Sequence, residues 1–266
     1  MRIQPKKRLG QNFLVDANIQ KKILAAMDLK LSDTALEIGS GRGELTQLVA
    51  PIVRSLFAVE IDRQMIGELA EKLKSFSHVR IIPADILKVD FRQLLSGYPR
   101  KTVVFGNIPY YITSPVIVRL IESRRNFQKI FLTVQKEFTQ RIAARTGGKD
   151  YGAFTCYVQY YLKPKILFEI KKNSFYPAPK VDSCFLELEI KKKLPLAGAR
   201  EAELFKIIRA AFNKRRKVLR NSLKGLVAAE RLAEFLKSRA LGEDIRPERL
   251  SLQEFISLIN FLRRSK

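Results

Sequence analysis

Short apolar runs rich in β-branched residues alternate, over the first 190 residues, with stretches in which apolar side chains recur every three to four positions. Short runs bounded by turn residues are typical of buried strands, and the longer period indicates amphipathic helices. Seven strands are predicted, near Ala35–Gly39, Ser55–Ile61, Val79–Ala84, Thr102–Gly106, Lys129–Gln135, Ile166–Ile170 and Ser183–Ile190. This alternation favours an α/β fold with a doubly wound, mainly parallel sheet.

The pattern changes after Ile190. The stretch KKKLPLAGAR is typical of a linker, and from about Glu201 the chain has helical periodicity without a strand signal. We therefore expect two domains, residues 1–190 with the sheet and residues 191–266 as a small all-helical domain.

The chain of 266 residues carries 50 Lys and Arg against 26 Asp and Glu, a formal net charge of +24. Such an excess costs stability through self-repulsion, which favours a polyanionic partner, with nucleic acid ahead of an anionic membrane surface. A basic surface that serves only solubility is the alternative. Residues 191–266 hold 20 basic and 8 acidic residues, so the predicted helical domain is the candidate nucleic-acid-binding module.

Cysteine and histidine usage excludes several kinds of site. Cys156 and Cys184 lie in apolar stretches and His78 is the sole histidine, so we expect no metal site and no Cys/His or Ser/His/Asp catalysis. Both cysteines are expected in the core. The basic N-terminus has no apolar segment behind it and no run of eighteen apolar residues occurs, so neither a secretory signal nor a membrane span is expected. A reducing cytoplasm fits this composition.

A glycine-rich turn follows the first predicted strand of the sheet. In LEIGSGRGELT, Gly39, Gly41 and Gly43 precede a predicted helix, where missing side chains and helix N–H groups let a ligand approach the backbone. The dinucleotide motif GxGxxG would require glycine at Glu44, which weakens an NAD interpretation. An ordinary tight turn is the alternative.

Acidic residues end the next two predicted strands. Glu60 is placed to accept hydrogen bonds from both hydroxyls of a ribose, and Asp85 from the exocyclic amine of an adenine. Since the carboxyl ends of parallel strands form one edge, these residues and the glycine turn predict a nucleoside cleft. Without a pyrophosphate motif, S-adenosylmethionine is the natural occupant.

The fourth strand ends in FGNIPYYITSP. An aromatic amine attacks a methyl sulfonium only when acceptors hold its hydrogens and direct its lone pair. The side-chain oxygen of Asn107 and the carbonyl of Ile108, held by the fixed φ of Pro109, are candidate acceptors. Tyr110 offers a face on which the target base can stack. A strand stopped by proline with packed tyrosines is the structural alternative.

These motifs, NIPYYITSP, IGSGRG, FAVEID and PADIL, together with QNFL, QKE, YGAF, FYPAPKVDS and RRKVLRNSL, resemble the S-adenosylmethionine-dependent ribosomal RNA adenine N6,N6-dimethyltransferases over almost the whole chain. The resemblance implies a Rossmann-like class I methyltransferase domain followed by a small helical domain. It also implies that Asn12 and Leu14 belong to an N-terminal segment closing over the cofactor, that Gly39 faces its methionine part, and that Asn107 contacts both cofactor and target amine. Phe175 is expected to stack on the flipped adenine, with core packing as the alternative.

The family has a small-subunit branch (KsgA type) and a large-subunit branch (Erm type, conferring macrolide resistance). PKVDS and the FNKRRKVLRNSL stretch, taken as a helix from Phe212 to Leu223, resemble the small-subunit branch, which implies dimethylation of two adjacent adenines of 16S rRNA during ribosome biogenesis. The expected partner is the rRNA of an immature small subunit, bound by a monomer. Tyr111 departs from the asparagine common in this branch. A large-subunit enzyme, or a cofactor-binding assembly or transcription factor without turnover, remains the alternative.

Five basic residues of that predicted helix are candidates for phosphate contacts. At 3.6 residues per turn they do not share one face, so only a subset is expected to contact RNA, and such contacts position the protein without choosing a base. They are Lys214, Arg215, Arg216, Lys217 and Arg220.

Overall fold

The computed structural model describes residues 5–6, 9–98, 102–213 and 217–263. The chain divides into two compact units: a first unit, Met1–Thr139 with Lys163–Ile190, and a second unit, Gln140–Leu162 with Lys191–Lys266. The predicted change after Ile190 is a boundary between the units. Residues 140–162, expected within the first domain, instead group with the C-terminal helices.

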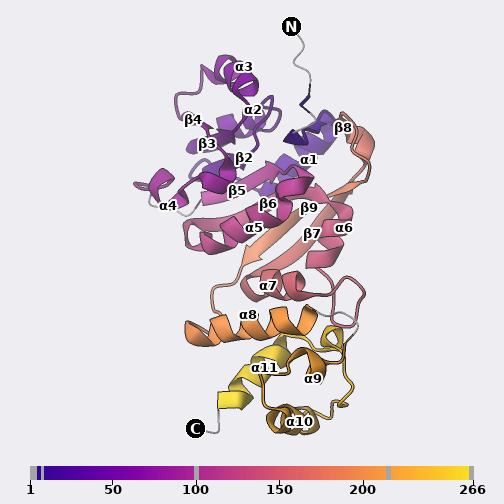
Figure 1. The fold of residues 1–266 in the computed structure, drawn as a ribbon. Coiled ribbons are helices and arrows are strands. Elements are labelled where there is room, and N and C mark those ends of the chain that lie inside the picture. The colour runs from indigo at the N-terminus through magenta and orange to yellow at the C-terminus, as the bar shows by residue number, and fades with distance from the viewer. Residues whose placement is uncertain (1–4, 7–8, 99–101, 214–216, 264–266) are drawn as a thin grey trace. The chain divides into compact units, whose positions relative to one another are not determined.

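A seven-stranded sheet forms the centre of the first unit, in the order β4-β3-β2-β5-β6-β9-β7, which can be followed in Figure 1. The seven predicted strands are all present. They are β2 (Thr34–Ile38), β3 (Ser55–Glu60), β4 (Val79–Pro83), β5 (Thr102–Asn107), β6 (Phe127–Gln135), β7 (Leu162–Ile170) and β9 (Ser183–Ile190).

Strand pairing places the tips of β2, β3 and β5 at one edge. β2 pairs in parallel with β3 on one side and with β5 on the other, so that Ile38 lies opposite both Val59 and Gly106. The pairs β3–β4 and β5–β6 are also parallel, whereas β6–β9 is antiparallel. The order reverses direction between β2 and β5, and ligands of open α/β sheets bind at the carboxyl edge of such a switch point.

The helices of the first unit connect these strands, and several begin at an aspartate. Asp16 accepts from the amides of Asn18 and Ile19 at the start of α1, and Asp62 accepts from Gln64 N at the start of α3, as expected for N-caps. The helices are α1 (Ala17–Met27), α2 (Thr46–Val49), α3 (Arg63–Leu73), α4 (Phe91–Leu94), α5 (Thr113–Glu122) and α6 (Lys136–Ile142), with short 3-10 turns η2 (Ala50–Ile52), η3 (Ile86–Lys88), η4 (Tyr110–Ile112), η5 (Arg124–Asn126) and η6 (Lys172–Ser174).

A core of apolar side chains holds α1 against the sheet. Ile23 and Met27 of α1 are buried in one cluster with Phe105 of β5 and Phe185 of β9. Phe185 also stacks on Phe131 of β6, with ring centroids 5.9 Å apart. Burial of each such side chain contributes about 1.5–3 kcal/mol, which keeps the strand tips in register.

A second, two-stranded sheet joins the N-terminal segment to the end of the first unit. β1 (Phe13–Leu14) pairs antiparallel with β8 (Phe175–Tyr176), placing Leu14 opposite Phe175. Two residues are too few to produce a detectable period, so this pairing was not predicted. The pairing places Phe13 and Leu14, the last two residues of the QNFL motif, beside β8.

The second unit is helical, and no strand occurs after Ile190 among its described residues. Phe205 of α8 packs against three tyrosines of α7, Tyr157, Tyr160 and Tyr161, with ring centroids 5.1–5.7 Å apart. This aromatic contact explains why α7 groups with the C-terminal helices. The helices are α7 (Ala153–Tyr161), α8 (Ala199–Phe212), α9 (Leu219–Ser222), α10 (Ala229–Ser238) and α11 (Leu252–Arg263), with the 3-10 turn η7 (Pro247–Arg249).

The expected continuous helix from Phe212 to Leu223 is wrong. α8 ends at Phe212, Val218 is extended with φ −65° and ψ 156°, and α9 begins at Leu219, whose amide donates to the Ile245 carbonyl. The extended backbone at Val218 separates the two helices.

Cys156 and Cys184 are both buried, as predicted. Burial raises the pKa of the Cys156 thiol to about 11, which leaves it protonated and inert. Over the described part of the chain, no cluster of side chains could hold a metal ion. No described helix combines the length and apolar character needed to cross a bilayer.

Candidate active site

A cavity of about 320 Å³ opens at the carboxyl edge of the sheet, in the first unit. Its walls come from the tips of β2, β3 and β5, the turn after β4, and the N-terminal segment from Leu9 to Leu14. The site residues predicted from sequence that line it are Asn12, Leu14, Gly39, Gly41, Glu60, Asp85, Asn107, Ile108, Pro109 and Tyr110.

The glycine turn after β2 lines the cavity with backbone in the left-handed region. Gly39 and Gly41 have φ of +71° and +54°, which favours glycine, and a Cβ on Gly41 would lie 3.1 Å from the Phe13 ring. Their amides are already used, since Gly39 N donates to the Val59 carbonyl and Gly41 N to Glu60. Neither of these two amides is therefore free to bind a ligand.

Glu60 is held rigidly at the tip of β3. Its Oε1 accepts from the amides of Ile61 and Asp62, and its Oε2 accepts from Gly41 N, all at 2.8 Å. A carboxylate offers about four acceptor positions, so Oε2 retains room for one more donor. Glu60 is thus fixed in place to receive a hydroxyl, although the backbone occupies most of its acceptor capacity.

Asp85 lines the cavity and uses one of its two carboxylate oxygens within the protein. Oδ1 accepts from Leu87 N at 3.0 Å and caps the turn η3. Oδ2 has no hydrogen-bond partner within the described part of the chain. An unused carboxylate oxygen on a residue of the cavity lining suits the exocyclic amine of an adenine.

Two buried residues of the cavity wall were not predicted. Glu37 of β2 accepts from Thr46 Oγ1 at 2.5 Å, and burial raises its pKa to about 8. Ser40 is 3% exposed, and its Oγ lies near enough to the Glu37 carboxyl to lower the pKa of that group but makes no hydrogen bond of good geometry. A buried hydroxyl whose hydrogen bonding is incomplete can accept a polar group of a ligand. In the sequence, Glu37 and Ser40 look like ordinary neighbours of the glycine turn, so no signal singled them out.

Asn107, the last residue of β5, has a fixed amide orientation. Its Nδ2 donates to the Asn12 carbonyl at 2.7 Å, which leaves Oδ1 as the acceptor. The amide of Ile108 donates to the Thr133 carbonyl, while no described donor reaches the Ile108 carbonyl. Pro109 holds φ at −55° directly after it. Two acceptors without partners therefore stand next to each other at the cavity.

The two tyrosines of the motif differ in their surroundings. The Tyr110 hydroxyl lies 2.7 Å from Ser183 Oγ of β9, and burial raises the pKa of the phenol. This contact orients the Tyr110 ring at the cavity wall. Tyr111 is 62% exposed and lies against Gly10, where a Cβ would approach its ring to 3.1 Å.

The expected stacking role of Phe175 does not fit its position. Phe175 is 3% exposed, belongs to the core cluster with Leu14, and does not line the cavity. Side chains alternate across a strand, so the next residue of β8, Tyr176, points outward and is 57% exposed. Core packing accounts for Phe175.

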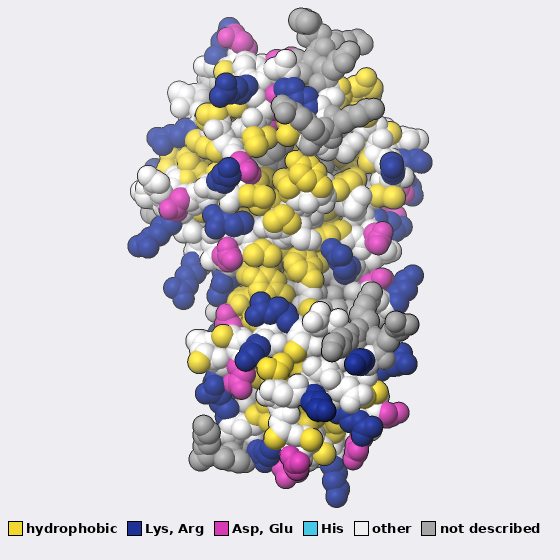
Figure 2. Space-filling view, in the orientation of Figure 1, with side chains coloured by type: hydrophobic (Ala, Val, Ile, Leu, Met, Phe, Trp, Pro, Cys, Tyr) yellow, Lys and Arg dark blue, Asp and Glu magenta, His cyan; other side chains and the backbone are white. Residues whose placement is uncertain are grey.

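The predicted phosphate-binding residues are only partly described. Lys214, Arg215 and Arg216 lie outside the described residues. Lys217 is exposed, and Arg220 is an exposed residue whose guanidinium lies 3.8 Å from Glu243. Figure 2 shows Lys and Arg side chains spread over both units, so positive charge is not confined to this stretch.

Comparison with known proteins gives consistent matches. The family model described as ribosomal RNA adenine dimethylase matches residues 2–264. The chain is 40% identical over 263 residues to ribosomal RNA small subunit methyltransferase A of Moorella thermoacetica, covering 96% of this chain and 91% of that protein. It is similar in structure to a dimethyladenosine transferase from Plasmodium falciparum (TM-score 0.79, 27% identity, 92% and 95% covered). The 23S rRNA methyltransferase ErmE gives a TM-score of 0.76 at 25% identity, with 95% and 100% covered.

Proposed function

The chain belongs to the ribosomal RNA adenine dimethylase family, and we propose that the end of β5 positions the N6 amine of an adenine for methylation. As a member it is an S-adenosylmethionine-dependent enzyme that dimethylates adenine in small-subunit rRNA. The observation that carries the proposal is the pair of adjacent acceptors at the cavity, Asn107 Oδ1 and the Ile108 carbonyl.

The cavity suits this cofactor through the chemistry of its donors and acceptors. S-adenosylmethionine, when bound, supplies a methyl group from a positively charged sulfonium. Glu60 and Asp85 would hold its ribose and adenine, and the buried Ser40 hydroxyl at the wall would meet a polar group of the ligand.

The chain's own groups orient the target amine. Each acceptor holds one hydrogen of the amine, so that the nitrogen lone pair points away from the plane of the ring and into the cavity. The Tyr110 ring supports the face of the base, which must leave its stack to reach the cavity. Pro109 keeps the Ile108 carbonyl in a fixed direction.

We further propose that the substrate is an immature small subunit, that two adjacent adenines are modified, and that the enzyme acts as a monomer in the cytoplasm. The 40% identity to a small-subunit enzyme supports this over the large-subunit alternative, which rests on 25% identity to ErmE. The intact Glu60, Asp85 and Asn107 set favours an enzyme over a factor without turnover. The second unit, with exposed Lys217 and Arg220, is the proposed RNA-binding module.

Replacement of Asn107 tests the proposal. Asn107→Ala removes an acceptor that matters chiefly in the transition state, so single-turnover methylation should slow by about 100-fold or more while RNA affinity changes little. Asn107→Asp keeps an acceptor but loses donation to Asn12, and should retain intermediate activity. Asn126→Ala is the matched control, because that amide also donates to a backbone carbonyl but lies outside the cavity lining. Methylation by Asn107→Ala at nearly the wild-type rate would refute the role.

A further inference from the structure

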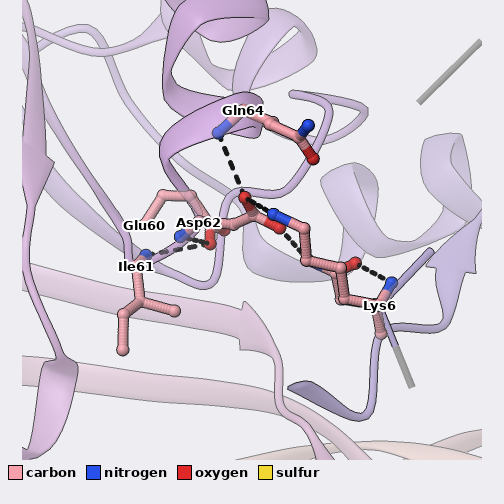
Figure 3. A network of polar contacts seen from close by, with 6 residues as sticks. Lys6, Glu60, Ile61, Asp62 and Gln64 are labelled. Carbon is pink, nitrogen blue, oxygen red and sulfur yellow. Dashed lines mark hydrogen bonds and ion pairs between the residues drawn. The ribbon is translucent and has the colours of Figure 1, made fainter. Parts of the chain in front are cut away.

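Asp62 is a buried carboxylate two residues after Glu60, and its side chain is 0% exposed. Its Oδ1 lies 2.6 Å from Lys6 Nζ and accepts from Gln64 N at 3.0 Å, and its Oδ2 accepts from Gln11 Nε2 at 3.0 Å. Figure 3 shows Lys6 and Gln64 meeting at this carboxylate. Asp62 therefore ties the start of α3 to a segment more than fifty residues earlier in the chain.

The anchored segment, defined here by residues 5, 6 and 9–14 and called the N-terminal strap, is braced internally. Lys6 N donates to Gln11 Oε1 at 2.7 Å, so the two residues that reach Asp62 also hold each other. Desolvation raises the pKa of Asp62, but hydrogen bonds from Lys6, Gln11 and Gln64 N lower it overall, which keeps the carboxylate charged.

The strap continues from this anchor directly to the proposed catalytic amide. Asn12 follows Gln11, and its carbonyl accepts from Asn107 Nδ2 at 2.7 Å. That single bond decides which end of the Asn107 amide points into the cavity, because the amide would otherwise be free to rotate by half a turn and present a donor. A target amine meeting a donor would not be held.

We propose that Asp62 is a positioning residue for methyl transfer: by binding Lys6 and Gln11 it fixes the strap, and the strap's Asn12 carbonyl orients Asn107. This inference rests on the proposed role of Asn107. It assigns Asp62 an effect on turnover although the residue does not line the cavity.

Asp62 also caps α3, so the test must separate capping from anchoring. Asp62→Ser keeps a good N-cap but is too short to reach Lys6 and Gln11. Asp90→Ser is the matched control, because Asp90 caps α4 through the amides of Arg92 and Gln93 and has no contact with the strap. Gln11→Met loosens the strap from its own side, without altering α3, should Asp62→Ser fold poorly.

Two readouts decide the matter. Amide hydrogen exchange of residues 9–14, measured by mass spectrometry on the free protein, should accelerate in Asp62→Ser and Gln11→Met but not in Asp90→Ser. In these two strap variants kcat should fall about tenfold, with the KM for rRNA unchanged, because orientation and not RNA binding is lost.

Unchanged exchange in residues 9–14, or kcat within twofold of the Asp90→Ser control, would overturn the positioning role. Asp62→Asn, which still accepts hydrogen bonds, should recover part of the rate, and no recovery would also count against it. If the wild-type protein methylates no adenine in the same assay, the proposed function itself fails, while the exchange measurement still reports on the strap.

Discussion

At the scale of single residues, variants of Tyr110 can show whether its ring or its hydroxyl contributes to turnover. Tyr110→Ala should slow turnover by about 10- to 100-fold, since stacking contributes about 1–3 kcal/mol per base. Tyr110→Phe keeps the ring but leaves the fully buried Ser183 Oγ unpaired, which should cost about 1–3 kcal/mol of stability.

The double variant Tyr110→Phe/Ser183→Ala removes both partners of this bond and should regain most of that stability, with turnover near wild type. Denaturant unfolding and single-turnover rates check the two quantities separately. A double variant as slow as Tyr110→Ala would show that the hydroxyl is required.

Glu37 makes stability depend on pH. Its pKa rises by burial from 4.5 to about 8, so the folded protein binds a proton there that the unfolded chain releases between these values. Stability should therefore fall as pH rises from about 4.5 to about 8, by an amount on the order of 5 kcal/mol at roughly 1.4 kcal/mol per pKa unit. Glu37→Gln stays neutral and should lack this loss.

Guanidinium unfolding of the ligand-free wild type and Glu37→Gln at pH 5.5 and pH 8.5 measures the effect. The variant should gain relative to the wild type at the higher pH. If the free energies of unfolding of the wild type and of Glu37→Gln differ by the same amount at both pH values, the Glu37 pKa is not raised.

At the scale of elements, the sheet could be predicted because β-branched runs bounded by turns specify buried strands directly. The limits of β5 and β9 differ from prediction by at most one residue. The β1–β8 pair could not be predicted, because two residues carry no period and the strand they pair with lies more than 160 positions away. The continuous helix predicted from Phe212 to Leu223 was wrong because a resemblance in sequence does not reveal a local break such as the extended Val218.

The candidate site could be predicted where its polar side chains lie at the ends of parallel strands. Glu60, Asp85 and Asn107 end or follow parallel strands, and topology brings them together. Ser183 and Asp62 act through contacts between segments distant in sequence, with Tyr110 and Lys6, and only the folded chain reveals such contacts. The stacking role predicted for Phe175 does not fit its position, because alternation along β8 decides which of two adjacent aromatic residues faces the core, and Phe175 is the buried one.

At the scale of the whole molecule, the net charge of +24 predicts strongly salt-dependent RNA binding. Removing residues 201–266 is not a suitable test, because it would remove Phe205 from the tyrosines of α7 and unfold what remains of the second unit. Lys217→Gln and Arg220→Gln avoid this problem. Each should reduce the slope of log affinity against log salt by about one if it contacts a phosphate.

The matched control for this salt dependence is Lys74→Gln, an exposed lysine of the first unit paired with Glu71. Filter binding to small-subunit rRNA between 50 and 200 mM salt gives the slopes. If the slope is unchanged in both variants, RNA does not bind near α9, and the basic residues of the first unit are the alternative binding surface.

The central claim, dimethylation of adenine in small-subunit rRNA, is tested most directly by mapping the methyl groups. The protein is incubated with isotope-labelled S-adenosylmethionine and, separately, with immature small subunits, large subunits and naked rRNA, and each RNA is digested and sequenced by mass spectrometry. The account predicts N6,N6-dimethyladenosine at two neighbouring adenines of small-subunit rRNA. Label confined to large-subunit rRNA, or absent from adenine altogether, would contradict it.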